Sequence, residues 1–135
     1  MSENLPENLG FAELVGVEWL DDDPDHARAR VDLRAELLQP FGLLHGGVFL
    51  TLVESVCSRS TALAVLDGGM AAMGQSINLN FVRPVIEGSA EVRARARHRG
   101  RSTWVWEAEV VDSEERVCAL AQMTVAVRPI RRTDS

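Results

Sequence analysis

One long apolar segment that carries a single acid constrains this chain more than any other feature. Between about Gly46 and Ala64 the sequence has helical periodicity, and it ends before the glycine-rich stop at residues 67–69. A helix that is apolar on most sides must be covered by other elements, so we expect a central helix. The apolar residues that cover most of its circumference are Val48, Phe49, Leu52, Val53, Val56, Ala62 and Leu63.

Glu54 is the acid inside this helix. A carboxylate among Leu52, Val53 and Val56 loses hydration worth on the order of several kcal/mol unless it is paired or used. A polar stripe runs along the helix at steps of three, four and three residues. A solvent-facing side of three turns normally carries several charges, so we interpret the stripe as the lining of a pocket, with a solvent-exposed face as the alternative. The stripe consists of Thr51, Glu54, Ser58 and Thr61.

Strand-like runs surround the helix. A short helix is predicted over Asn8 to Val15, with Leu9, Ala12 and Phe11 on one side, and a hairpin over residues 19–32. The hairpin turn, Asp21 to Pro24, lacks the spaced ligands and the glycine of a calcium loop, so we expect a solvated turn.

Four strand-like runs follow the helix, at residues 75–82, 89–98, 103–111 and 116–127, and the first three alternate between apolar and polar residues. The second and third form a predicted hairpin in which Arg93 and Arg95 lie opposite Glu109 and Glu107, as an exposed charge ladder. The last run is apolar on both alternating sets, which is typical of a strand covered on both sides or used at a subunit contact. This order of elements predicts an α+β fold, an antiparallel sheet wrapped around one long helix.

Composition limits the functional classes. With 135 residues and 46% apolar content, residues 1–135 suit one domain. All 14 basic residues are arginine against 20 acids, a net charge of −6, so binding of nucleic acid or anionic membrane is not expected. A local arginine cluster could still hold a phosphorylated ligand.

The start of the chain does not resemble a signal peptide, and the least charged stretch, residues 37–53, is broken by proline and glycine, so we expect a cytoplasmic protein. Cys57 and Cys118 are expected to be buried free thiols, with no metal site.

The motifs resemble those of hotdog-fold acyl-CoA thioesterases. They are most similar to the 4-hydroxybenzoyl-CoA thioesterases with a helix glutamate, which include phenylacetate-pathway-like enzymes. A glutamine six residues before the histidine and a glutamate nine residues after it make the signature specific, and Ser58 stands where the most similar aryl-CoA enzymes have threonine. The matching pieces are Gln39, Phe41 to Gly47, Glu54, Ser58, Gly74 to Ser76, Phe81 to Pro84, Gly100 to Trp106 and Ala126 to Pro129.

This resemblance implies hydrolysis of an acyl-CoA thioester, such as 4-hydroxybenzoyl-CoA, to free acid and coenzyme A. No cofactor is expected, because coenzyme A is part of the substrate. A medium-chain or phenylacetyl-CoA thioesterase, a hotdog hydratase or dehydratase, and a non-catalytic acyl-CoA-binding protein are the alternatives. The family also implies homodimers that pair their sheets edge to edge, often as dimers of dimers, with active sites at the dimer interface.

Roles for individual residues follow from the matched motif. The backbone N–H of Gly46, at the positive end of the helix, suits the negative oxygen that develops on the thioester carbonyl. Glu54 is either the nucleophile or the general base, and Ser58, one turn on, orients the carboxylate or the water. Gln39 is expected to be a second hydrogen-bonding group. His45 is expected to position the helix start, with a general base and a purely structural residue as the alternatives.

Two further expectations concern the substrate. Arg99, Arg101, Ser102 and Thr103 match the nucleotide side of the family's site, although a solvated charged turn is an equal alternative. Gly46 and Glu54 are eight residues apart, which is about 12 Å along a helix axis. One thioester carbonyl cannot contact both, so we expect active sites shared between two subunits.

Overall fold

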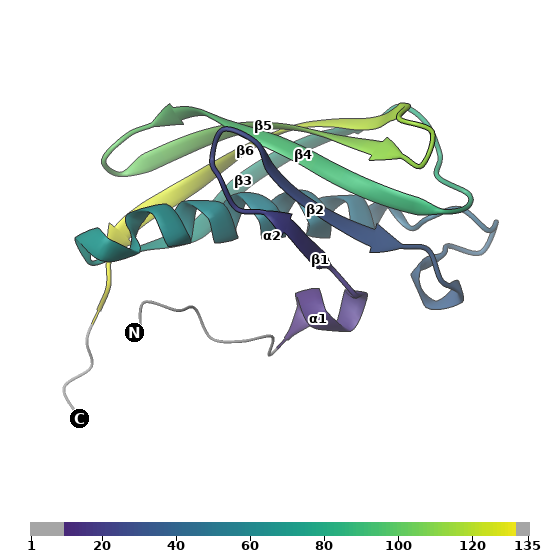
Figure 1. Cartoon of the computed structure of the whole chain (residues 1–135), viewed down its shortest axis with the longest axis horizontal. Coiled ribbons are helices and arrows are strands. Elements are labelled where there is room, and N and C mark those ends of the chain that lie inside the picture. Colours follow the sequence, from purple (N-terminus) through teal and green to yellow (C-terminus); the bar gives the residue numbers. More distant parts are fainter. Residues whose placement is uncertain (1–9, 132–135) are drawn as a thin grey trace.

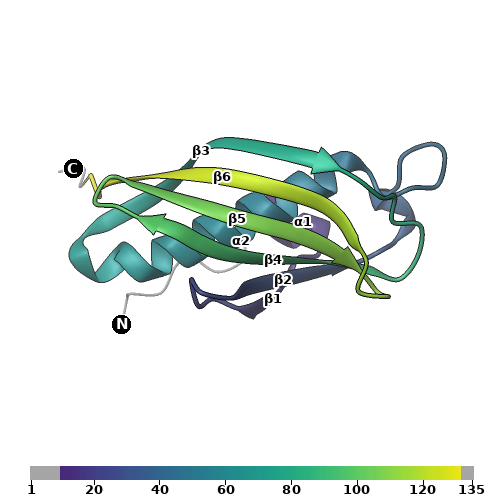
Figure 2. The same cartoon turned by 90° about the horizontal axis from the view of Figure 1, so that it is seen from above.

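A six-stranded antiparallel sheet and one long helix make up the protein in residues 10–131, the part that this computed structural model describes (Figures 1 and 2). The sheet has the order β1-β2-β4-β5-β6-β3, and α2 runs along one of its faces. This arrangement confirms the predicted α+β hotdog fold. The elements are α1 (Phe11–Val15), β1 (Glu18–Asp21), β2 (Ala27–Asp32), a 3₁₀ turn (Ala35–Leu37), α2 (Gly46–Val65), a second 3₁₀ turn (Leu66–Gly68), β3 (Met70–Phe81), β4 (Ser89–Arg99), β5 (Thr103–Asp112) and β6 (Val117–Pro129).

The predicted central helix is confirmed within one residue. Apolar side chains of α2 pack against the inner face of the sheet, where Trp106 is fully buried. By length and composition the segment from Gly46 to Gly68 could cross a membrane, but its apolar face is occupied by this packing. The buried residues of α2 are Val48, Phe49, Leu52, Val53, Val56, Cys57, Ser60 and Thr61.

The predicted hairpins are present, with some boundaries moved. β1 pairs with β2, and β4 pairs with β5. β3 begins at Met70, five residues before the predicted start, because it continues its pairing with β6 up to the turn after α2. The first helix begins at Phe11, which is 65% exposed and so is not part of the core. Asn8 and Leu9 lie outside the described residues.

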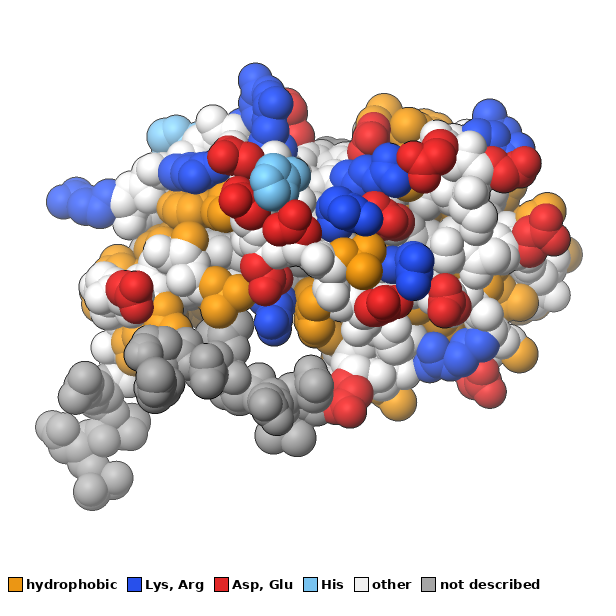
Figure 3. Space-filling model, in the orientation of Figure 1, with side chains coloured by type: hydrophobic (Ala, Val, Ile, Leu, Met, Phe, Trp, Pro, Cys, Tyr) orange, Lys and Arg blue, Asp and Glu red, His pale blue; other side chains and the backbone are white. Residues whose placement is uncertain are grey.

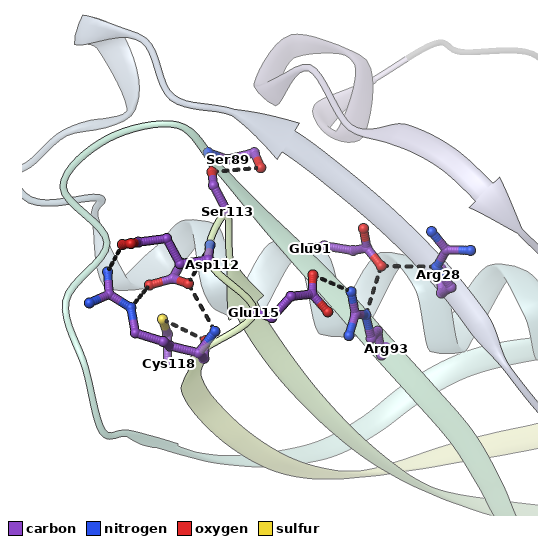
Figure 4. Close-up of polar contacts among 10 residues, drawn as sticks. Arg28, Ser89, Glu91, Arg93, Asp112, Ser113, Glu115 and Cys118 are labelled. Atoms are coloured by element: carbon purple, nitrogen blue, oxygen red, sulfur yellow. Dashed lines mark hydrogen bonds and ion pairs between the residues drawn. The ribbon is translucent and has the colours of Figure 1, made fainter.

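The charge ladder has the predicted register but different ion pairs. Arg93 lies opposite Glu109, and Arg95 lies opposite Glu107. Arg93 instead binds Glu91 at 2.8 Å and Glu115 at 2.9 Å (Figure 4). An arginine side chain is long and flexible, so its ion-pair partner need not be the residue directly opposite on the next strand. Figure 3 shows arginines and acids interspersed over the side of the molecule that faces the viewer in Figure 1.

One face of β6, the face that points away from α2, is partly exposed to solvent in the single chain. Leu120 is 48% exposed, whereas Met123, Val125 and Val127 are buried toward α2. The prediction that β6 is covered on both sides is therefore wrong for one chain, because α2 covers only one face of the sheet. Use of this strand at a subunit contact stays a prediction.

A bulge interrupts β3 in its middle. β3 forms one edge of the sheet, and its pairing with β6 shifts register between Gly74 and Ser76. One extra residue in a strand reverses which side chains face the core. Met70 and Ala72 before the shift, and Ile77 and Leu79 after it, therefore all pack against the core.

Candidate active site

The start of α2 presents an unused backbone donor. His45 is the N-cap, and its Nδ1 accepts a hydrogen bond from the N–H of Gly47 at 2.9 Å. The N–H of Val48 bonds to the His45 carbonyl at 2.9 Å. The N–H of Gly46 makes no hydrogen bond to any residue from 10 to 131. It therefore remains available to a ligand at the positive end of the helix.

The imidazole of His45 is already engaged by this cap. Since Nδ1 accepts the Gly47 N–H, the ring carries its proton on Nε2 in the neutral form. The geometry favours the predicted positioning role over a general base, because the basic nitrogen is occupied.

A short loop places Gln39 beside Gly46. The backbone N–H of Gln39 donates to the Leu43 carbonyl at 2.8 Å, and its side-chain Oε1 accepts from the N–H of Phe41. The side-chain NH₂ is then the group left to donate to a ligand. Both residues line one cavity of about 440 Å³, formed by Gln39, Leu43, Leu44, Gly46, Phe49, Phe81, Val82, Arg83 and Pro84.

Phe81 is the wall of this cavity that sequence reasoning did not identify as a site residue. A methyl group on Gly46 would lie 3.1 Å from Cζ of Phe81, so the ring covers the first residue of the helix. The ring also packs edge-on against Phe49, with centroids 5.5 Å apart. Its inward alternation with Ile77 and Leu79 was the signal that it would reach α2.

Glu54 and Ser58 form the second half of the candidate site. The Ser58 hydroxyl donates to Oε2 of Glu54 at 2.9 Å, as the predicted one-turn spacing allows. Glu54 is exposed in the single chain. The prediction of a carboxylate buried among apolar residues is therefore wrong for one chain by itself. Successive helical residues point about 100° apart, so Leu52 and Val53 face the core while Glu54 does not.

The predicted polar stripe divides into separate environments. Thr51 bonds back to the Gly47 carbonyl at 2.8 Å. Thr61 is fully buried and accepts a hydrogen bond from Nε1 of Trp106 at 2.9 Å. The stripe is therefore not one continuous pocket lining, because Thr61 satisfies the core tryptophan instead.

The cysteines are buried free thiols, as predicted. Burial raises the pKa of the Cys57 thiol well above its ordinary value, and the negative charge of Glu54 adds to the rise. Cys57 is therefore unsuited to act as a nucleophile. Within residues 10–131, no cluster of three metal-ligating side chains occurs.

The predicted coenzyme A residues lie away from the cavity. Figures 1 and 2 show the β4–β5 turn at the end of the molecule where α2 finishes, opposite the end where α2 begins. Arg99 is paired with Asp25 and lies 5.6 Å from the Trp104 ring centroid. Arg101 is exposed and forms no ion pair within the described chain. The structure therefore does not bring this turn together with Gln39 and Gly46.

Backbone groups of the same turn are used internally. The Ser102 carbonyl accepts from the N–H of Val127 at 2.9 Å and from Nη1 of Arg128 at 2.6 Å. The N–H of Gly100 donates to the Thr103 carbonyl at 2.9 Å. These contacts shape the turn, so Arg101 is the member of the predicted group that is most open to a ligand.

Comparison with known proteins agrees with the family that the sequence motifs suggest. The model of the "Thioesterase superfamily" matches residues 41–119. The 1,4-dihydroxy-2-naphthoyl-CoA hydrolase of Escherichia coli K12 is 35% identical over 119 residues, which cover 88% of this chain and 85% of that protein.

Solved structures agree with the fold and the family. Thioesterase HI1161 from Haemophilus influenzae superposes with a TM-score of 0.84 at 29% identity, covering 92% of this chain and 86% of that one. A variant of thioesterase PA1618 from Pseudomonas aeruginosa gives a TM-score of 0.84 at 31% identity, covering 88% and 86%. The chain therefore belongs to the thioesterase superfamily and is a hotdog-fold acyl-CoA thioesterase.

Proposed function

We propose that this enzyme hydrolyses an aryl-CoA thioester to the free acid and coenzyme A, in active sites shared between two subunits. The observation that carries the acyl preference is the cavity beside Gly46, in which Phe49 and Phe81 form an aromatic wall. The Escherichia coli relative named 1,4-dihydroxy-2-naphthoyl-CoA hydrolase supports a hydroxylated aromatic acyl group. 4-Hydroxybenzoyl-CoA belongs to the same chemical class.

The proposed chemistry uses the two halves described above. The N–H of Gly46 and the NH₂ of Gln39 donate to the thioester oxygen as it becomes negative. Glu54 either attacks the carbonyl carbon or removes a proton from the water that attacks it. Ser58 holds one oxygen of that carboxylate. If Glu54 attacks, the carbon–sulfur bond breaks, the sulfur takes a proton from water, and a second water then hydrolyses the acyl-enzyme anhydride to the free acid and the Glu54 carboxylate. If Glu54 acts as a base, the water oxygen bonds to the carbonyl carbon, the carbon–sulfur bond breaks, and the proton taken up by Glu54 passes to the sulfur of coenzyme A.

The free edge of β3 supports a shared site. β3 is a 12-residue edge strand that contains no charged residue and no proline, whereas the opposite edge, β1, has four residues, two of them acids. Long edge strands without such protection are suited to pairing with another chain. Met73 and Phe81 on this strand are each 56% exposed, as expected for residues that a second copy covers.

A two-fold pairing of β3 with its copy would join the two half-sites. Glu54 lies beside Gly74 near the middle of β3, and Gly46 lies beside Phe81 at its end. Antiparallel pairing about an axis between these two levels brings Glu54 of one subunit toward Gly46 of the other. The partner's helix start, the positive end of its dipole, then faces the Glu54 carboxylate.

The test is release of free thiol from a set of acyl-CoA substrates. The set contains 1,4-dihydroxy-2-naphthoyl-, 4-hydroxybenzoyl-, benzoyl-, phenylacetyl- and hexanoyl-CoA, with Glu54→Gln as the matched inactive control. We expect the highest kcat/KM for a hydroxylated aryl-CoA, and loss of most turnover in the variant.

Each of the remaining outcomes would overturn a different part of the proposal. Preference for hexanoyl-CoA overturns the aryl assignment. Binding without thiol release from any substrate indicates an acyl-CoA-binding protein. Hydration of an unsaturated acyl-CoA without release indicates a hotdog hydratase. Full turnover by Glu54→Gln shows that the catalytic carboxylate lies elsewhere.

A further inference from the structure

Gly74 lies against the carboxylate of Glu54 although the two residues belong to different elements. A methyl group placed on Gly74 would lie 3.2 Å from Oε2 of Glu54 and 2.8 Å from Cε of Met123. The first distance is tighter than ordinary van der Waals contact, and the second requires Met123 to move. Met123 is flexible at its end and can shift, but Oε2 is also the oxygen that Ser58 holds at 2.9 Å.

The bulge in β3 directs Gly74 to this place. Register with β6 shifts between Gly74 and Ser76, so Gly74 faces α2 and the inward alternation resumes at Ile77. Without the extra residue, the inward set before the bulge would continue at Ser76, and Ile77 and Leu79 would face outward. The bulge therefore lets one strand contact Glu54 and also complete the core near the start of α2.

The two carboxylate oxygens of Glu54 have different contacts. Oε2 receives the Ser58 hydroxyl and is backed by Gly74, whereas Oε1 has no hydrogen bond to any described residue. We infer that Gly74 is a positioning residue for the hydrolysis: it leaves the space in which Ser58 holds Oε2, so that Oε1 is the oxygen presented to the substrate or water. This inference rests on the proposed catalytic role of Glu54.

The first test is Gly74→Ala in the chain of residues 1–135. Misplacement of a catalytic group by less than about 1 Å can lower kcat by about tenfold to a hundredfold, and we expect a loss of this size with KM nearly unchanged. Gly68→Ala is the matched control, because a methyl group there meets nothing within 4 Å. Circular dichroism and thermal unfolding check that both variants are folded.

The second test separates positioning from core packing. Gly74→Ala combined with Met123→Leu removes the clash with Cε of Met123 but keeps the crowding of Glu54. We expect this double variant, measured against Met123→Leu alone, to stay as slow as Gly74→Ala alone. Recovery of kcat in the double variant would mean that Gly74 serves the core, and would overturn the inference.

The third test is a double-mutant cycle with Ser58→Ala. If both residues act through Oε2, the combined variant should lose much less than the product of the two single losses in kcat. Independent, multiplicative losses would contradict the inference. Glu54→Gln, measured in parallel, separates the two levels of the proposal: an active Glu54→Gln rejects the catalytic carboxylate itself, whereas an inactive Glu54→Gln with a fully active Gly74→Ala rejects only the role of Gly74.

Discussion

Nδ1 of His45 accepts the backbone N–H of Gly47 at 2.9 Å, and the neighbouring N–H of Gly46 is left without a partner in the described chain. One side chain thus satisfies the second donor of the helix and leaves the first donor open. This arrangement makes a helix start that is both stable and able to bind a developing oxyanion.

The cap predicts how His45 variants behave. Asparagine is among the best N-cap residues, so His45→Asn should keep the fold and most of kcat, whereas His45→Ala should lose about 1 kcal/mol of unfolding free energy. Denaturant unfolding and steady-state kinetics measure both. A fall in kcat of about a hundredfold or more in a correctly folded His45→Asn would instead identify the imidazole as a general base.

The open N–H of Gly46 predicts a large difference between two substitutions. Both Gly46→Ala and Gly46→Pro press on the Phe81 ring, because a methyl group there lies 3.1 Å from Cζ. Proline also removes the N–H and is tolerated at the first helical position. We expect kcat of the proline variant to be about a hundredfold below that of the alanine variant, the scale for one lost oxyanion donor.

The alanine variant is the control for the contact with Phe81 in this comparison. Equal kcat values for two folded variants would show that the Gly46 N–H does not stabilise the transition state.

Shared active sites predict complementation between inactive subunits. Gly46→Pro and Glu54→Ala damage opposite halves, so a mixed dimer has one doubly damaged site and one intact site. Random assortment makes half of the dimers mixed, and activity should return to about a quarter of wild type. Differently tagged subunits, purified in two affinity steps, supply confirmed mixed dimers. Inactive mixed dimers would show that each site lies within one chain.

Glu91 predicts a pH-dependent contribution to stability. Burial opposes ionisation of Glu91, but hydrogen bonds from Arg28 at 2.9 Å and Arg93 at 2.8 Å outweigh it and hold the pKa of this carboxyl below its ordinary value (Figure 4). A lowered folded-state pKa stabilises the protein above the unfolded-state pKa, and the stabilisation is lost as the pH falls through the folded-state value.

The variant Glu91→Gln should therefore melt about 3 °C below wild type at pH 7, the change expected for about 1 kcal/mol in a chain of this size. The difference should shrink as the pH falls from about 5 to 3, since glutamic acid has an unfolded-state pKa of about 4.3. Glu87→Gln is the control, because Glu87 is exposed and has no ion pair within residues 10–131. A difference that is constant with pH would exclude the charge of Glu91 as its cause.

Local periodicity in the sequence was sufficient to predict most of the secondary structure. The helix from Gly46 was predicted within one residue because its apolar pattern, its start and its glycine stop all act within the segment itself. The β4–β5 register was also predictable, since a short turn connects the two strands. The one-turn spacing of Glu54 and Ser58 follows from helix geometry alone.

Only the tertiary structure determined how distant segments meet. The contact of Phe81 with Gly46, the contact of Gly74 with Glu54 and the burial of Thr61 beneath Trp106 all join residues that lie far apart in the sequence. These contacts depend on strand register and on the bulge in β3, and a shift by one residue would reverse every side chain. Sequence periodicity identifies the apolar side of an element, but the packing of all elements together determines which residue it contacts.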